Sequence, residues 1–130
     1  MTGLRGWIIF AWIALPTVMY GGYSLSQLIN RGNILTASQA NYFRAGHAHA
    51  GVLTLMSLLY YIFLDLTTLP LAIKHTACVA IVVGILAQSG GFFIQLSPER
   101  GSLGTKVTLT GAAILVSAIA VLVYGLVTLR

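Results

Sequence analysis

Two histidines, His47 and His49, lie two residues apart in segment 46–51, which reads Gly-His-Ala-His-Ala-Gly within a long apolar stretch. Imidazole nitrogens commonly ligate metal ions and haem iron, and an ionisable side chain inside a membrane usually has a functional role. The glycine and alanine neighbours leave room beside both rings. The pair therefore indicates a ligand or cofactor site.

The spacing of the two histidines restricts the site that they can form on a helix. Residues two apart are separated by about 200° around the helix axis, so the imidazoles point to nearly opposite faces. A zinc-binding helix instead has its histidines four residues apart, on one face. The third histidine, His75, is expected on the other side of the membrane. A metal ion held by His47 and His49 would therefore need ligands from another subunit or of another type.

Segment 44–56 resembles the His-x-His helix of the catalytic subunits of haem-copper oxidases and nitric oxide reductases, in which histidines of one transmembrane helix ligate two haems. The resemblance implies that His47 matches the ligand of the active-site haem and His49 that of the low-spin haem. The additional ligand histidines that this family carries on other helices have no counterpart at the right depth. The resemblance therefore implies a b-type haem without oxygen or nitric oxide reduction.

A second axial contact to such a haem would come from a histidine of a second protomer, from water, or from another side chain. The candidate side chains for this second axial contact are Tyr23, Met56 and Gln95. Met56 lies seven residues after His49, and therefore on the same helix face. Arg44, at the membrane boundary beside the histidines, completes the predicted cofactor-binding set.

Composition places these residues in an integral membrane protein. Hydrophobic residues make up 58% of the 130-residue chain and charged residues only 7%, which excludes a water-soluble domain with an ordinary charged surface. Four apolar stretches have about the 20 residues that a helix needs to cross a bilayer. We predict a single all-α domain, an up-down bundle of four transmembrane helices in a bacterial-type plasma membrane. The expected helices are 7–29, 45–69, 70–96 and 105–129.

Boundary signals refine these helices. Thr36 and Ser38 are helix-capping residues, so the second helix is expected to begin before its apolar core. Pro70 fits the first turn of the third helix. Segment 97–102 reads as a tight polar connection, and Pro16 is expected to kink the first helix or remove one of its hydrogen bonds.

Small and polar residues recur with helical periodicity in three segments, and we expect these stripes to face the bundle interior. They are Trp12, Pro16, Tyr20, Tyr23 and Gln27 in the first helix, Gly84, Gln88, Gly91 and Gln95 in the third, and Lys106, Thr110, Ala113, Ser117 and Tyr124 in the fourth. An up-down order places most of the polar ones in the same half of the membrane as the histidines. We therefore expect the site in that half.

The remaining reactive and charged residues indicate no second site. The net charge of +5 is spread thinly along the chain, which argues against a nucleic-acid partner. The single cysteine, Cys78, cannot form an intramolecular disulfide and is expected to be buried. Asp65 and His75 are expected near the opposite membrane boundary. No nucleophile and base stand out as a pair, so the sequence favours a protein that is not an enzyme.

Three functional classes remain. The first is a small haem- or metal-binding membrane protein with His47 and His49 as ligands, acting in electron transfer or haem handling. The second is a non-enzymatic small subunit or assembly factor of a larger membrane complex, in which each histidine contributes about 0.6 to 2 kcal/mol as a hydrogen-bonding group between helices. The third is an oligomeric transporter or channel, with a flux that changes where histidines titrate. All three place the chain in a lipid bilayer, as a homo-oligomer or in a larger complex.

Overall fold

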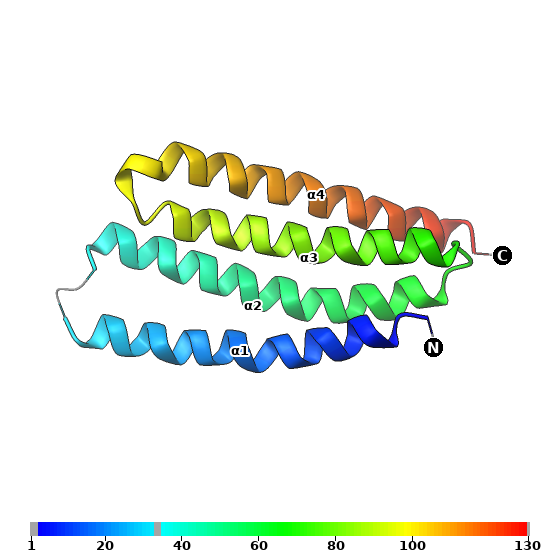
Figure 1. The fold of residues 1–130 in the computed structure, drawn as a ribbon, viewed down its shortest axis with the longest axis horizontal. Helices are drawn as coiled ribbons and strands as arrows, with labels where there is room; N and C mark the ends of the chain where they lie inside the picture. The colour runs from blue at the N-terminus through cyan, green and yellow to red at the C-terminus, as the bar shows by residue number, and fades with distance from the viewer. Residues whose placement is uncertain (1–2, 33–34, 130) are drawn as a thin grey trace.

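The computed structural model describes residues 3–32 and 35–129, and these residues form four long α-helices and no strand (Figure 1). The helices are α1 (Arg5–Asn30), α2 (Ala37–Leu66), α3 (Leu71–Ile94) and α4 (Gly101–Val127), with a short 3-10 turn, η1 (Pro98–Arg100), before α4. Each α-helix is long and apolar enough to cross a membrane. The predicted all-α, multi-pass membrane fold is therefore confirmed.

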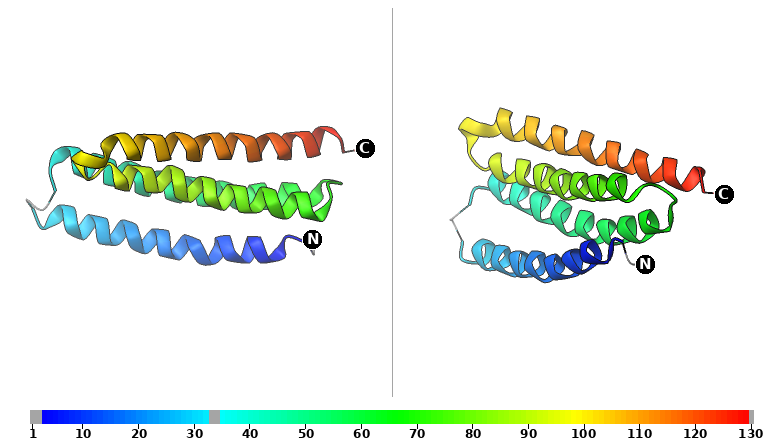
Figure 2. Two further views of the ribbon diagram at one scale, coloured as in Figure 1. Left: turned by 45° about the horizontal axis from the view of Figure 1, so that its top comes forward. Right: turned by 45° about the vertical axis from the view of Figure 1, so that its right-hand side comes forward.

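Consecutive helices run in opposite directions, and the bundle is open rather than closed. In Figures 1 and 2, α2 and α3 occupy the middle, and α1 and α4 lie on opposite outer sides. The α1 helix packs mainly on α2, whereas α4 packs mainly on α3 and touches α2 less. One link between α2 and α4 is a hydrogen bond of 2.8 Å from the Tyr60 hydroxyl to the Ala118 carbonyl.

The closest packing joins α3 to α4 through glycines. A Cβ atom added to Gly91 would lie 2.6 Å from the backbone oxygen of Gly104. A Cβ added to Gly111 would collide with the backbone of Gln88. Small residues at a membrane helix interface let two backbones approach and gain van der Waals contact. These glycines therefore define the α3–α4 interface.

The α2 helix begins at Ala37, well before the predicted start at residue 45, because its first turns are capped outside the apolar core. The Thr36 hydroxyl accepts a hydrogen bond of 3.2 Å from the Gln39 N–H, and the Gln39 side chain accepts one of 3.0 Å from the Thr36 N–H. This reciprocal capping box confirms the prediction of an early start at Thr36.

The other end of α2 is at Leu66 rather than at residue 69, and a lysine of the next helix binds it. The Nζ atom of Lys74 donates to the carbonyls of Asp65 at 2.9 Å and Thr67 at 2.7 Å. A cation at a helix C-terminus satisfies carbonyls that lack a partner within the helix. This role of Lys74 is not evident from the sequence, because the lysine belongs to α3 and reaches α2 only through the turn.

The remaining predicted boundaries hold to within a few residues. Pro70 precedes the first residue of α3 and is the N-cap rather than a member of its first turn. The connection predicted at 97–102 contains η1, and α4 already begins at Gly101 instead of residue 105. The α1 helix continues through Pro16.

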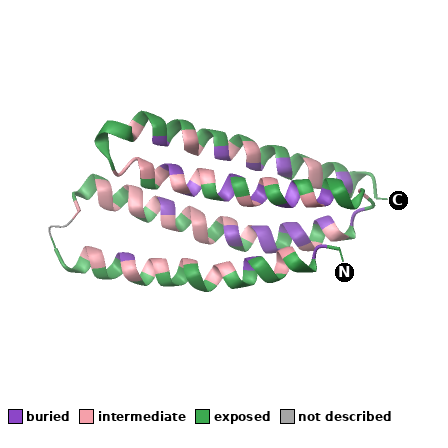
Figure 3. Ribbon diagram, viewed as in Figure 1, coloured by how far each residue is buried: buried purple, intermediate pink, exposed green. Residues whose placement is uncertain are grey.

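The predicted inward stripes are wrong for α1 and α4. On α1, Trp12 is 62% exposed, Tyr20 71% and Tyr23 62%, and Pro16 and Gln27 are also exposed. All five stripe residues of α4 are exposed as well: Lys106, Thr110, Ala113, Ser117 and Tyr124. The outer surfaces of both helices are mainly green in Figure 3. Both polar stripes therefore point away from the bundle.

The physical reason is that close backbone approach, rather than polarity, determines the packed faces. The α4 helix is buried through small residues and one leucine: Gly104, Gly111, Leu115, Ala118 and Gly125. The prediction is right for α3, whose Gly84 and Gly91 are buried and whose Gln88 and Gln95 are partly buried. The α3 stripe is the one in which glycines and polar residues share a face.

The hydrophobic core lies in the half of the membrane opposite the histidines. Its fully buried side chains are Leu4, Tyr61, Leu64, Cys78 and Ile81. Figure 3 shows that the buried residues of α2 lie mostly near the chain termini. The expected burial of Cys78 is confirmed. In the histidine half of α2, residues 37–52 are exposed or partly buried, apart from Gly46.

Candidate functional site

The His47 side chain faces α1. A Cβ atom added to Gly22 would lie only 2.6 Å from Nε2 of His47, so the ring packs directly on the helix backbone at this glycine. The described residues provide no hydrogen bond to the ring. His47 therefore acts in this structure as a packing group between α1 and α2.

The His49 side chain faces α3 and has a fixed ring orientation. Its Nδ1 atom lies 2.8 Å from the carbonyl oxygen of Ala45, one turn earlier. A carbonyl oxygen only accepts, so Nδ1 carries the proton, and Nε2 of the neutral ring keeps a free lone pair. The ring also lies against Phe92 of α3, with centroids 4.8 Å apart. His49 is half-buried, and its Nε2 is the atom suited to a ligand.

The two imidazoles thus lie on opposite sides of α2, as their spacing predicts. His47 contacts α1 through Gly22, and His49 contacts α3 through Phe92. The two rings cannot converge on one ion. The described residues contain no group of three or more His, Cys, Asp or Glu side chains that would hold a metal ion.

Of the other predicted site residues, Arg44 lies on the His47 side of α2 and Met56 shares the helix face of His49. Arg44 is exposed and lines a hollow of about 320 Å³ between α1 and α2, together with Gly22, which contacts His47. Met56 is half-buried two turns after His49, on the same face of α2.

Tyr23 and Gln95 lie elsewhere. Tyr23 is on the outward face of α1, where its ring is 6.4 Å from that of Tyr20. Gln95 packs on α4, since a Cβ at Gly104 would be 2.5 Å from its Cγ. The fold therefore does not place either residue beside His47 or His49.

His75 lies at the opposite end of the bundle, as expected, and it contacts another helix. Nε1 of Trp7 donates a hydrogen bond of 2.9 Å to Nδ1 of His75, which links α1 to α3. The His75 ring is half-buried. A third histidine therefore contributes nothing to the site at His49.

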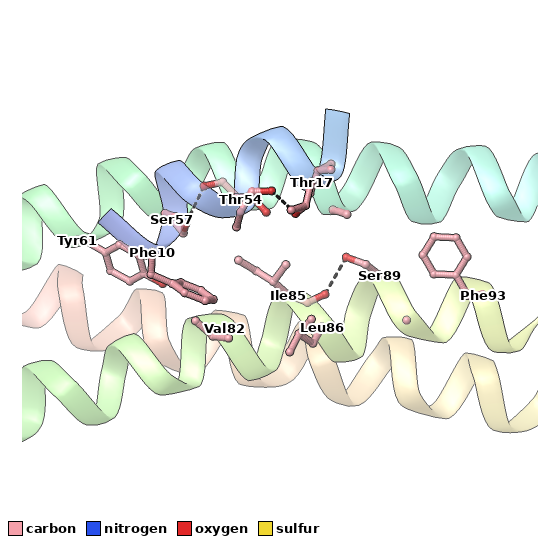
Figure 4. Close-up of a pocket in the computed structure, with 15 residues that line it drawn as sticks. Phe10, Thr17, Thr54, Ser57, Tyr61, Val82, Ile85, Leu86, Ser89 and Phe93 are labelled. Atoms are coloured by element: carbon pink, nitrogen blue, oxygen red, sulfur yellow. Dashed lines mark hydrogen bonds between the residues drawn. The ribbon is translucent and has the colours of Figure 1, made fainter. Parts of the chain in front are cut away.

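A hollow of about 340 Å³ lies between α1 and α3, as Figure 4 shows, and was not predicted from the sequence. From α2, it is lined by Thr54, Ser57 and Tyr61, whose side chains share one helix face. The helical spacing of these three hydroxyl-bearing residues is visible in the sequence and indicates a polar face of α2. The hollow itself is formed by residues from three helices, so no short sequence pattern predicts it.

Comparison with known proteins found no match: no protein-family model, no curated protein and no solved structure is significantly similar to this chain. Function therefore has to be inferred from the geometry of the sites.

Proposed function

We propose that this chain is a small haem-binding protein of a bacterial-type plasma membrane, with Nε2 of His49 as an axial ligand of a b-type haem. The hydrogen bond between Nδ1 of His49 and the Ala45 carbonyl carries the proposal. Such a bond selects the tautomer, orients the ring and raises the basicity of the ligating nitrogen, as is usual for histidines that bind metals.

Ligand number favours haem over a free metal ion. A structural or catalytic zinc site needs three or four protein ligands, and the described residues bring no such group together. A haem supplies the equatorial nitrogens itself and needs only one or two axial ligands from protein. A single well-oriented histidine therefore suits haem.

The second axial ligand in this proposal is His49 of a second protomer. Met56 lies on the same helix face as His49, so it cannot reach the opposite side of a porphyrin bound there. His47 packs on Gly22 and would become a ligand only if α1 moved away. Arg44 lines the hollow between α1 and α2, and therefore does not lie on the face of α2 that carries His49. A haem held in this way would supply one-electron redox chemistry.

The test is the absorption spectrum and iron content of the detergent-purified protein, both as isolated and after addition of haemin. We expect a Soret band that is lost in His49→Ala and retained in His47→Ala and His75→Ala. The two latter variants are matched controls, because each removes one imidazole elsewhere in the fold. Absence of the band from the wild type, or its equal loss in His47→Ala and His49→Ala, would contradict the assignment of His49 as the ligand.

A second candidate function, subunit of a larger membrane assembly, is favoured by the outward polar stripes of α1 and α4. Polar side chains within a membrane usually face protein rather than lipid. Tyr20 and Tyr23 on α1 and Ser117 and Tyr124 on α4 are all exposed. In an assembly, a partner helix would cover them.

This second candidate is tested with a spin label at Tyr20→Cys in a Cys78→Ala background. We expect low oxygen accessibility in native membranes and high accessibility once the chain is purified into nanodiscs. A label at Val52, which is also exposed, is the control position. High accessibility of position 20 in native membranes would contradict a covered α1 stripe. No specific observation favours transport, which stays a prediction.

A further inference from the structure

The hollow between α1 and α3 has the size and surface of a small-molecule site. It measures about 340 Å³ and has α2 as its floor (Figure 4). Small side chains such as Ala14 and Ala50 create its depth, and Phe10 and Leu86 line it while remaining exposed on the outer surface. Ligand pockets typically have volumes of about 300–1,000 Å³. An α-helix with its side chains is about 10 Å wide, so the hollow is too small to seat one.

One end of this hollow is closed. The hydrogen bond from Trp7 to His75 links α1 and α3 just beyond the point where Tyr61 lines the wall. The rings of Trp7 and Tyr61 are 6.1 Å apart. The hollow is therefore blind near Tyr61 and open to the bilayer along its side.

The hydroxyl groups along the hollow differ in their hydrogen bonding. Thr17, Ser57 and Ser89 each donate to a carbonyl of their own helix, at 2.6, 2.7 and 2.7 Å. Tyr61 is 0% exposed, and in the described part of the chain its hydroxyl is the one buried side-chain polar atom without a hydrogen-bond partner of good geometry. The nearby Ser57 hydroxyl donates its proton to the Thr54 carbonyl and does not lie in hydrogen-bonding geometry to the Tyr61 hydroxyl. A buried donor without an acceptor is unfavourable, and an acceptor from a ligand would relieve this.

We propose that the hollow binds a membrane-dissolved molecule with an apolar body and a carbonyl oxygen that accepts a hydrogen bond from Tyr61. The apolar lining of the hollow matches the apolar body of the ligand, and the unpaired Tyr61 hydroxyl matches its carbonyl oxygen. A plain hydrocarbon tail would fill the space but leave the hydroxyl unpaired. Because the Tyr61 hydroxyl is buried, binding in this way requires a side chain that lines this end of the hollow, such as the half-exposed Phe10, to turn aside.

The Tyr61 end of this site is distant from the proposed haem ligand, although the hollow also includes Ala50, the neighbour of His49. Tyr61 is twelve residues after His49, which corresponds to about 18 Å along α2, and the hollow lies between α1 and α3. Carbonyl groups of this kind come from two sources in a membrane, a quinone ring or a fatty acyl ester. The experiment therefore includes one probe of each type.

Trp7 provides the reporter, because it lies beside Tyr61 and is one of only two tryptophans. In a Trp12→Phe background, decylbenzoquinone is titrated into the protein in nanodiscs while the Trp7 fluorescence is recorded. We expect saturable quenching, with affinity weakened about three- to tenfold in Tyr61→Phe, the range for one hydrogen bond. Decylbenzene, which has no carbonyl, should compete at least threefold more weakly than the quinone. Displacement of the quinone by dioctanoylglycerol would identify acyl esters as ligands, and its failure would restrict the site to quinone-type carbonyls.

Matched variants separate binding from partition into the bilayer. Tyr60→Phe removes a hydroxyl that bonds Ala118 on the α4 side and should leave the affinity unchanged. Ala14→Leu fills the hollow and should abolish saturation, whereas Ala113→Leu, on the exposed face of α4, should not. Non-saturable quenching that ignores Ala14→Leu overturns the proposal, as does equal affinity of wild type and Tyr61→Phe. If Tyr61→Phe fails to fold, equal competition by decylbenzene and quinone in the wild type overturns it instead.

Discussion

The contact between His47 and Gly22 shows how one missing side chain positions a histidine. At Gly22, an added Cβ would lie 2.6 Å from Nε2 of His47, whereas at Gly21 it would lie 3.8 Å from Nδ1, an ordinary contact. We expect Gly22→Ala to destabilise the protein by about 1–3 kcal/mol through overpacking. Gly21→Ala should have little effect. The measurement is the loss of helical circular dichroism during SDS titration, and equal stability of the two variants would contradict this role of Gly22.

Lys74 is a second residue with a structural role, because its side chain connects α3 to the end of α2. Its ammonium group binds the Asp65 and Thr67 carbonyls at the end of α2 and is buried. Lys74→Met should cost about 1–3 kcal/mol, because two carbonyl acceptors lose their donor. Lys106→Met, on the exposed face of α4, is the matched control and should be neutral. Equal midpoints in the same SDS titration would show that the lysine does not stabilise the turn.

Among the elements, the α3–α4 pair depends most directly on glycine. Gly90 and Gly91 are adjacent, but an added Cβ at Gly90 meets nothing within 4 Å, whereas at Gly91 it meets the Gly104 oxygen at 2.6 Å. We expect Gly91→Ala to separate α3 from α4 and to cost about 1–3 kcal/mol. Gly90→Ala should be neutral or slightly stabilising, because alanine is the better helix former.

The glycine prediction is checked by thermal unfolding in detergent, followed by circular dichroism, with both variants measured at the same protein concentration. Equal unfolding temperatures of Gly90→Ala and Gly91→Ala would contradict a close α3–α4 contact.

At the scale of the whole molecule, the proposed haem site requires two chains. If one His49 from each protomer ligates the iron, haemin titration should saturate at one haem per two chains, and the loaded protein should migrate as a dimer in size-exclusion chromatography. His49→Ala should stay unloaded, while its helical content stays that of the wild type. Saturation at one haem per chain by a monomeric species would instead indicate a second axial ligand from the same chain or from water.

The sequence by itself determined the features that depend on local periodicity. Apolar runs of membrane-spanning length predict the four helices, since a helix in lipid must satisfy its own backbone. The two-residue spacing places His47 and His49 on opposite faces of α2, and Thr36 with Gln39 makes the capping box. Each of these follows from residues within a few turns of one another.

Only the tertiary structure decided which faces of the helices are covered. The polar stripes of α1 and α4 were expected inside and lie outside. On α4, the close approach of backbones at Gly91, Gly104 and Gly111 orients the helix. The Trp7–His75 link and the hollow beside Tyr61 join residues from helices that are far apart in the sequence. Helical periodicity identifies a polar face, but van der Waals contact between small residues determines the face on which a membrane helix packs.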